Sequence, residues 1–384
     1  MVNDQNKFTF QPAGLRSVYV TLRGGIRGRI AKKPECSSNV KDYLLNLVSS
    51  YGLYHKSPEM KHISILVPKE AVPAAIVDPR YMFSAINMFY EQSGKDPVFD
   101  IQLVGLTKQV SLINSVFSVN TDKILHEVKK TDLIIVPALS GDIKNAVAMN
   151  KEFIPWIVDQ FNRGAEVASL CVGAFLLAST GLLSGKKCST HWLFANEFRD
   201  MFPDITLTDG SIITEDHGLY SSGGAASYWN LLLHLVEKYT NREMAIRAAK
   251  FFAIEIDRKS QSPFIMFNGQ KRHEDEPIKR AQEFIEANVT EKISVEELAD
   301  RFAIGKRHFE RRFKKATSNT PAEYIQRVKV EAAKKKLETG MKNVNEVMYE
   351  VGYSDTKTFR TVFKKVTGLL PAEYRSKYNR AAIN

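Results

Sequence analysis

Long apolar segments are missing from this sequence. No stretch approaches the ~20 apolar residues that a membrane-spanning helix needs, and the N-terminus lacks the apolar core of a signal peptide. Cysteine is sparse as well, because only Cys36, Cys171 and Cys188 occur, and their spacing fits no metal site. We therefore expect a cytoplasmic protein with free thiols, no metal, no cofactor and no membrane contact.

Acidic residues are outnumbered by basic ones, and the excess is local. The 384 residues include 54 Lys and Arg against 43 Asp and Glu, a net charge of +11. Residues 277–384 hold 23 basic and 14 acidic residues, or +9, whereas the remainder of the chain carries only +2. A concentrated positive charge is what nucleic-acid binding requires. The chain length predicts two or three domains.

The C-terminal part contains one short segment twice. Residues 313–324 and 363–374 agree at eight of twelve positions, and both end in Pro-Ala-Glu-Tyr. A repeat this close predicts a supersecondary unit that is built twice. Each unit is predicted as a helix, a tight turn and a second helix, which is the helix-turn-helix arrangement. We expect Gly305 to open the first turn and Gly352 to make the second.

Local signals mark the helices of both units. Ser294 and Glu297 have the spacing of a capping box, which predicts a helix through Arg301. In the second unit, either Ser354 or Asp355 is expected to cap the second helix. Pairs of phenylalanines four residues apart are predicted to point inward from the second helices: Phe309 and Phe313, then Phe359 and Phe363.

The outward faces of the two second helices are cationic. Lysine and arginine on a helix can reach guanine edges and phosphates in the major groove of DNA. A solvated basic face on an ordinary helical bundle is the alternative, but its occurrence twice at a fixed interval favours DNA. The basic residues on these faces are Lys306, Arg307, Arg311, Arg312, Lys314, Lys315, Lys357, Arg360, Lys364 and Lys365.

Residues 278–378 resemble the DNA-binding domain of the AraC family of bacterial transcription regulators. The likeness lies in the two turns, the repeated Pro-Ala-Glu-Tyr, a long helix from about Pro321 to Glu338 and the segment 351–355. Lys329 stands where the family usually carries Arg. The resemblance implies that one chain places both second helices in successive major-groove segments, about one helical turn apart. The expected DNA-contacting residues are Lys306, Arg307, Glu310, Arg311, Thr356, Lys357, Arg360 and Thr361.

Residues 62–256 alternate between strand-like and helix-like segments in the order β-α-β-β-α-β-α. This order predicts a largely parallel sheet with helices on both faces. The fold class that we expect is an α/β flavodoxin-like domain followed by an all-α domain with two helix-turn-helix units. The predicted strands are Ile63–Val67, Phe99–Gly105, Leu133–Pro137 and Glu166–Leu170, and the predicted helices are Pro79–Tyr90, Lys151–Asn162 and Trp229–Tyr239.

One predicted strand runs directly into Cys171, and small residues then allow a helix to begin at once. This is the logic of a nucleophile elbow, with cysteine in place of serine. The N-terminus of that helix is expected to lower the pKa of Cys171. His191, 20 residues on, is the candidate base. The alternative is a buried core thiol and a core histidine without chemistry.

With Gly181–Gly185, Thr190–Trp192 and Ser222–Gly224, this segment resembles the amidase-like domain of class I glutamine amidotransferases, in their PfpI-type branch. The branch's enzymes also use an acidic residue of the first helix. That position falls near Tyr81 here, and Asp78 would substitute only with a different register. Ala138 and Leu139 replace the Gly-Gly pair of the oxyanion hole. We therefore expect no catalysis and regard Cys171 and His191 as vestigial.

Open α/β sheets bind ligands at the carboxyl ends of their strands. We expect such a pocket to sense a small metabolite, and the resemblance suggests one that contains nitrogen. An alternative role for Cys171 is redox sensing. The expected pocket residues are Ser140, Gly141, Cys171, His191 and Gly223.

The sequence thus predicts four regions. Residues 1–61 are a poorly defined extension, either disordered or an arm that adds phosphate contacts. Residues 62–256 form the sensor, residues 257–277 are a linker rich in breakers and mixed charge, and residues 278–384 form the DNA-binding domain.

A ligand-responsive transcription regulator is the leading hypothesis. Its expected partners are promoter DNA, a small-molecule effector and a second copy of the chain, with RNA polymerase as a further candidate. The ligand would change how two DNA-binding domains are presented, which requires different affinities for two states. The alternatives are a Cys-dependent amidase or peptidase with a DNA-binding appendix, and an architectural DNA binder that senses nothing.

Overall fold

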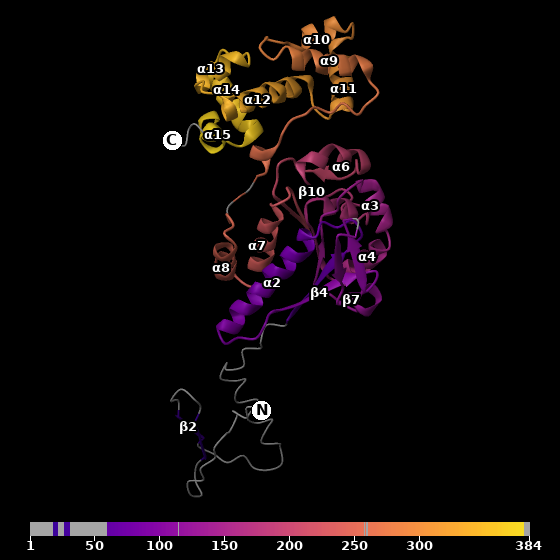
Figure 1. Ribbon diagram of the computed structural model, residues 1–384, viewed down its shortest axis with the longest axis vertical. Coiled ribbons are helices and arrows are strands. Elements are labelled where there is room, and N and C mark those ends of the chain that lie inside the picture. The colour runs from indigo at the N-terminus through magenta and orange to yellow at the C-terminus, as the bar shows by residue number, and fades with distance from the viewer. Residues whose placement is uncertain are drawn as a thin grey trace. The chain divides into compact units, whose positions relative to one another are not determined.

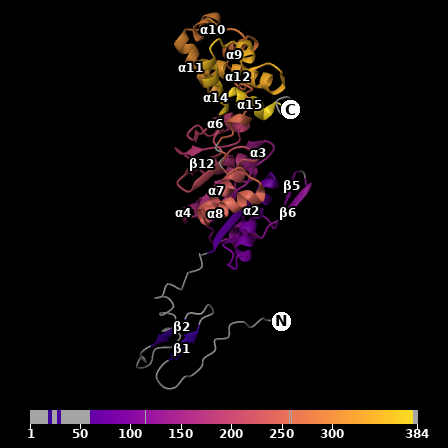
Figure 2. The ribbon, with the colours of Figure 1, turned by 90° about the vertical axis from the view of Figure 1, so that its left-hand side faces the viewer.

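The structure is a computed structural model, and it divides into two units, residues 1–58 and residues 59–384. In the first unit only the strands β1 (Val18–Thr21) and β2 (Arg27–Ile30) are described, and they pair antiparallel (Figure 2). Both interpretations of the N-terminal extension fall outside the described residues. In the second unit the description covers residues 60–379, apart from Asn114, Asp257 and Lys259.

A seven-stranded sheet forms the centre of the first domain, in the order β12-β13-β9-β8-β3-β4-β7. Every neighbouring pair is parallel except β12 and β13, which form an antiparallel edge. The predicted largely parallel sheet is therefore confirmed. Its strands are β3 (Lys61–Val67), β4 (Phe99–Gly105), β7 (Lys123–Ile124), β8 (Leu133–Val136), β9 (Glu166–Ser169), β12 (Ile213–Asp216) and β13 (Leu219–Ser222).

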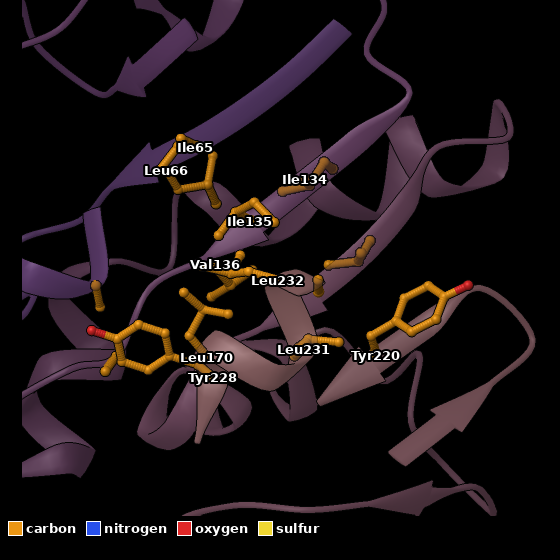
Figure 3. Packing of buried hydrophobic residues seen from close by; sticks show 14 of the residues in the cluster. Ile65, Leu66, Ile134, Ile135, Val136, Leu170, Tyr220, Tyr228, Leu231 and Leu232 are labelled. Carbon is orange, nitrogen blue, oxygen red and sulfur yellow. The ribbon is translucent and has the colours of Figure 1, made fainter. Parts of the chain in front are cut away.

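Helices cover both faces of the sheet, which explains why β8 is a continuous apolar run with all four residues buried. One face carries α2 (Ala74–Gln92) and α7 (Tyr228–Tyr239), on which α8 (Arg242–Phe252) packs (Figure 1). The other face carries α3 (Ile143–Met149), α4 (Phe153–Asn162) and α5 (Ala174–Ala178). Figure 3 shows Leu231 and Leu232 of α7 gathered against the central strands.

The helix α2 starts five residues earlier than predicted. The sequence predicts Pro79 at its beginning, where a missing N–H costs nothing, but Pro79 lies inside the helix that begins at Ala74. The short elements were not predicted either, because two to four residues hold no readable periodicity. These are the hairpin of β5 (Gln109–Leu112) and β6 (Phe117–Asn120), which projects in Figure 2, and the paired strands β10 (Lys187–Cys188) and β11 (Thr206–Leu207). The seven-residue helix α6 (Ala195–Met201) was not predicted either.

The C-terminal region is entirely helical in its described part and has two cores. The first half of α12 contributes Tyr324 and Val328 to one core, and the second half contributes Val330 and Leu337 to the other. One long helix thus joins two separately packed units, visible in Figure 1. The helices are α9 (Glu276–Ala287), α10 (Val295–Arg301), α11 (Lys306–Thr317), α12 (Pro321–Thr339), α13 (Val344–Glu350), α14 (Thr356–Thr367) and α15 (Pro371–Tyr378).

The sequence repeat is also a repeat in packing. Phe309 and Phe359 are fully buried, as predicted. Phe313 meets the ring of Tyr324 edge-on at 5.2 Å between centroids, and Phe363 meets Tyr374 in the same way at 5.5 Å. Such pairs add to the burial of the rings themselves, so the Tyr at the end of each repeated segment closes its own core.

The two turns differ in a way that the repeat does not reveal. In the second unit Gly352 has a φ of +74°, as expected for a turn glycine, but in the first unit the left-handed residue is Ala303, with a φ of +52°. The expectation for Gly305 is therefore wrong, because Gly305 is the N-cap of α11. The second turn is one residue longer than the first, and Asp355 caps α14.

Candidate DNA-binding surface and effector pocket

The first unit owes its geometry to a capping box. The Ser294 hydroxyl accepts the N–H of Glu297 at 3.1 Å, and the Glu297 carboxylate accepts the N–H of Ser294 at 2.9 Å. These bonds satisfy backbone donors at the start of α10. They fix where the first helix begins and, through the short turn, where α11 presents its outer face.

The predicted DNA-contacting residues lie on the outer faces of α11 and α14. On α11, Lys306, Arg307 and Arg311 are exposed and Glu310 is half-buried. No carboxylate in the described part of the chain forms an ion pair with Arg307 or Arg311, so both guanidinium groups face solvent. On α14 the exposed members are Lys357, Arg360 and Thr361, with Thr356 half-buried.

Two residues of this surface already have local partners. Lys306 pairs with Glu296, but both side chains are exposed, and surface ion pairs of this kind contribute little stability. The Thr361 hydroxyl donates to the carbonyl oxygen of Lys357 at 2.8 Å. Neither contact prevents an approach to DNA.

Arg312, which the sequence places on the outward face of α11, is paired with a residue outside that helix. Its guanidinium forms two hydrogen bonds with the carboxylate of Asp275, at 2.9 and 2.7 Å. The side-chain hydrogen bond to Arg312 lowers the pKa of Asp275 against the opposing effect of burial. Asp275 also caps α9, so this pair ties the start of that helix to α11.

Lys329 lies in the middle of α12, 5% exposed, between the two units. Its ammonium donates to the carbonyl oxygens of Glu291 and Val351, at 2.8 and 3.1 Å. Burial lowers its pKa. The lysine that replaces the family's usual arginine thus has a structural role, whereas the sequence indicates only a changed contact.

The predicted nucleophile elbow is present in the sheet domain. β9 ends at Ser169, and Cys171 has a φ of +54°, a left-handed conformation that is uncommon for non-glycine residues. The N–H of Cys171 donates to the hydroxyl of Ser222 at 3.2 Å. Gly173 allows the turn to pass directly over the carbonyl of Pro137, since a Cβ there would overlap it.

The predicted lowering of the Cys171 pKa is wrong. Burial raises the pKa of this thiol to about 12, because Cys171 is only 4% exposed and a thiolate there would lose its water. The helix α5 that follows has only five residues and begins after a 3₁₀ turn, so its dipole offers little compensation. The thiol is therefore protonated at neutral pH.

His191 hydrogen-bonds within its own segment. Burial lowers its pKa, and its Nδ1 accepts the N–H of Leu193 at 3.1 Å. Among the described residues, no carboxylate hydrogen-bonds to this imidazole. His191 therefore lacks the group that would orient it as a base.

Tyr81, at the expected acidic position of the first helix, and Asp78, one turn before it, have different surroundings. Tyr81 is 53% exposed and packs on the ring of Phe252. Asp78 instead accepts a hydrogen bond from the Tyr228 hydroxyl at 2.6 Å. The pKa of Tyr228 is raised by burial first, then by Asp78, and through space by Cys171. Tyr228 thus holds the Asp78 carboxylate and is also close enough to Cys171 to be affected by its charge.

The five predicted pocket residues fall into two groups. The Thr190 hydroxyl donates to the carbonyl oxygen of Cys171 at 3.1 Å, which joins the elbow to the segment of His191. Gly223 lies against the side chain of Gln261, which comes from the linker. Ser140 instead donates its hydroxyl to the carbonyl of Glu70 at 3.0 Å, and Gly141 adjoins the Glu70 carboxylate.

Gln261, Ser222 and Tyr228 were not predicted from the sequence. Gln261 lies among chain breakers and Tyr228 is an ordinary helix residue, whereas Ser222 begins the segment 222–224 that carries the resemblance, although the sequence assigns no role to it. In the described part of the chain, no group of three or more His, Cys, Asp or Glu side chains is arranged to hold a metal ion. No helix there is long and apolar enough to cross a membrane.

The chain thus combines two domains. The first is a parallel-sheet domain with a left-handed turn at Cys171, and the second contains two helix-turn-helix units. Residues 298–377 match the family model of a helix-turn-helix domain, and residues 85–238 match that of the DJ-1/PfpI family. The chain therefore carries an AraC-type helix-turn-helix domain behind a DJ-1/PfpI domain, and both predicted resemblances are confirmed.

Named relatives match parts of this chain. The HTH-type transcriptional regulator GbdR of Pseudomonas aeruginosa is 25% identical over 255 residues, 64% of this chain and 66% of GbdR. CdhR, an HTH-type transcriptional regulator of the same species, is 21% identical over 266 residues, covering 69% of this chain and 78% of CdhR. AdaA of Bacillus subtilis, a bifunctional transcriptional activator and DNA repair enzyme, is 40% identical over 106 residues, 28% of this chain and 50% of AdaA. The match thus spans about two thirds of GbdR.

Proposed function

We propose that this protein is a transcription regulator that binds duplex promoter DNA through α11 and α14. The observation that carries the proposal is that each of the two separately packed units exposes a cationic helix. On α11, Arg307 and Arg311 have no ion-pair partner within the described residues. The relatives named as HTH-type transcriptional regulators support it. We assign residues 278–384 to DNA binding, residues 257–277 to the linker and residues 62–256 to sensing.

The sensor, in this proposal, binds a small molecule and does not catalyse its conversion. A thiol with a pKa of about 12 is a poor nucleophile at neutral pH. His191 uses its Nδ1 for a backbone N–H, and Asp78 is engaged by Tyr228. An amidase or peptidase would need a Cys, a base and an orienting acid in one hydrogen-bonded chain. The effector pocket would lie beside Cys171, His191 and Gly223, with Ser140 and Gly141 at its margin.

We further propose that the protein acts as a homodimer in the cytoplasm and contacts RNA polymerase at promoters. A dimer would present four helix-turn-helix units, and an effector that favours one dimer geometry would change which DNA is bound.

The test is selection of bound fragments from genomic DNA by the purified full-length chain. Recovery of a shared motif in a few fragments is expected. Log affinity for a recovered fragment should fall with log salt, by roughly 0.9 per phosphate neutralised. Fragments without a shared motif, bound with equal affinity, would instead indicate an architectural DNA binder. Turnover of amide or peptide substrates that disappears in Cys171→Ala would revive the enzyme.

A further inference from the structure

The linker residue Gln261 is inserted into the sheet domain and is only 2% exposed. Its Nε2 donates to the carbonyl oxygens of Thr190 and Ser211, at 3.0 and 3.2 Å. Its Oε1 accepts the N–H of Trp192 at 3.3 Å. The carboxamide therefore uses both donors and its acceptor, all with main-chain partners.

The shape of this site requires glycine beside it. A Cβ on Gly223 would overlap the Nε2 of Gln261. The carboxamide can approach the backbone this closely only because side chains are absent there. The site adjoins the elbow, since Thr190, which accepts from Gln261, also donates to the carbonyl oxygen of Cys171.

The hydrogen-bonding groups of the site are selective. Two carbonyl oxygens and one N–H match a primary carboxamide, which offers two donors and an acceptor. A carboxylate would face the two carbonyl oxygens with no proton to donate. An ammonium or amidinium group would leave the Trp192 N–H without an acceptor, and unpaired buried groups are costly.

The segment that holds Gln261 also touches the DNA-binding domain. A Cβ added to Gly368, which ends α14, would meet Ser262 and Pro263 at ordinary van der Waals distance. Two residues further, the carbonyl of Ile265 accepts a hydrogen bond from Lys334 of α12 at 2.5 Å. The N–H of Phe267 donates to Glu331 of α12 at 3.1 Å. Gln261 thus anchors one end of a strap, residues 261–267, which reaches α14 and the second half of α12 before Phe267 packs against the core of the first unit.

We propose that this is a binding site for primary carboxamides, which the chain's own Gln261 fills in the absence of effector. The inference rests on the proposed sensing function and names the chemistry of its ligand. A small molecule that carries a carboxamide takes the place of the Gln261 side chain, the strap leaves the sheet domain, and the second unit loses that anchor. The free and liganded states then differ in how the DNA-binding domain is held.

Propanamide, the isolated glutamine side chain, is the probe, and propanoate and propylamine are its isosteric controls. Hydrogen exchange of the full chain, read in peptides that cover residues 258–267, is expected to rise with propanamide alone. In Gln261→Ala those peptides should exchange fast without any addition. Binding of propanamide, followed by calorimetry, should be about tenfold tighter to Gln261→Ala than to the natural chain, because the tethered competitor is gone.

Gln270→Ala is the matched control, because Gln270 is also a linker glutamine but meets the sheet domain through one side-chain bond, to Asn196 at 2.9 Å. It should bind propanamide like the natural chain. Equal effects of propanamide and propanoate, or equal affinity for the natural chain and Gln261→Ala, would overturn the proposal. If Gln261→Ala does not fold, the exchange experiment on the natural chain still decides. These readouts use no DNA, so failure to bind DNA is a separate result.

Discussion

The buried ammonium of Lys329 donates a hydrogen bond to the carbonyl oxygen of Val351, 3.1 Å away, across the boundary between the two helix-turn-helix units. It bonds to the carbonyl of Glu291 in the first unit at the same time. Gly352 makes this possible, since a Cβ there would overlap the lysine Nζ. One side chain therefore links the end of α13 to the segment between α9 and α10.

Replacing Lys329 by Met should weaken this link. The carbonyl groups of Glu291 and Val351 would lose their buried donor, which should lower the free energy of unfolding by about 1–3 kcal/mol. Urea unfolding measures this change. Lys335→Met on the exposed face of α12 is the control and should change stability little. If both variants are equally stable, Lys329 does not join the units.

Replacing neighbouring arginines on α11 should affect different properties, DNA binding in one case and thermal stability in the other. Arg311 is exposed, so Arg311→Ala should leave folding unchanged and weaken binding to a selected DNA fragment by about 1–3 kcal/mol. Arg312→Ala removes the partner of Asp275 and should lower thermal stability, with a smaller direct effect on DNA binding. Fluorescence anisotropy and thermal unfolding distinguish the two. Similar profiles for both variants would contradict the assignment.

Lys357→Ala should weaken DNA binding and relax preference at particular base positions, if Lys357 reads base edges in the major groove. Competition with fragments that carry single base changes measures this preference. A loss that is uniform across all sequences, with a salt dependence reduced by about one phosphate contact, would make Lys357 a phosphate ligand instead. In the same assay Lys335→Ala should bind DNA like the natural chain.

Alkylation of Cys171 should be slow and strongly dependent on pH. Its pKa rises from 9.0 to about 12 on folding, so at pH 8 the thiolate fraction falls roughly 1,000-fold. Between pH 9.0 and about 12, the Cys171 thiol keeps its proton in the folded state but loses it in the unfolded chain. The contribution of Cys171 to the free energy of unfolding is therefore fully present below pH 9.0 and is lost as the pH rises toward 12. Iodoacetamide labelling followed by peptide mapping tests the rate, with the urea-unfolded chain as reference. Rapid labelling of the folded chain at pH 7 would favour redox sensing or catalysis.

The sequence predicts what depends on local periodicity and on repeats. The parallel strands, the capping box of Ser294 and the inward phenylalanines follow from patterns a few residues long, and the duplication indicates both helix-turn-helix units. The elbow at Cys171 is also readable, because a strand followed at once by small residues permits few other turns.

What the sequence does not predict depends on contacts between distant residues. The pKa of Cys171 is set by burial under the whole domain, and the Asp78 carboxylate is held by Tyr228, 150 residues away. Arg312 looks like its neighbour Arg311 until Asp275 is placed beside it. Gln261 has no local pattern, because its partners are backbone groups that only the fold brings together.

The unequal turns of the two helix-turn-helix units make the DNA-binding domain asymmetric. The units follow one another along a single chain, and the second turn is one residue longer, so no rotation exchanges α11 and α14. A stretch of DNA that fits both helices in one direction would not fit them when inverted. If the chain acts at promoters, flipping its target in place would aim the sheet domain toward the opposite flank. The orientation of the DNA site, and not only its base sequence, would then affect regulation.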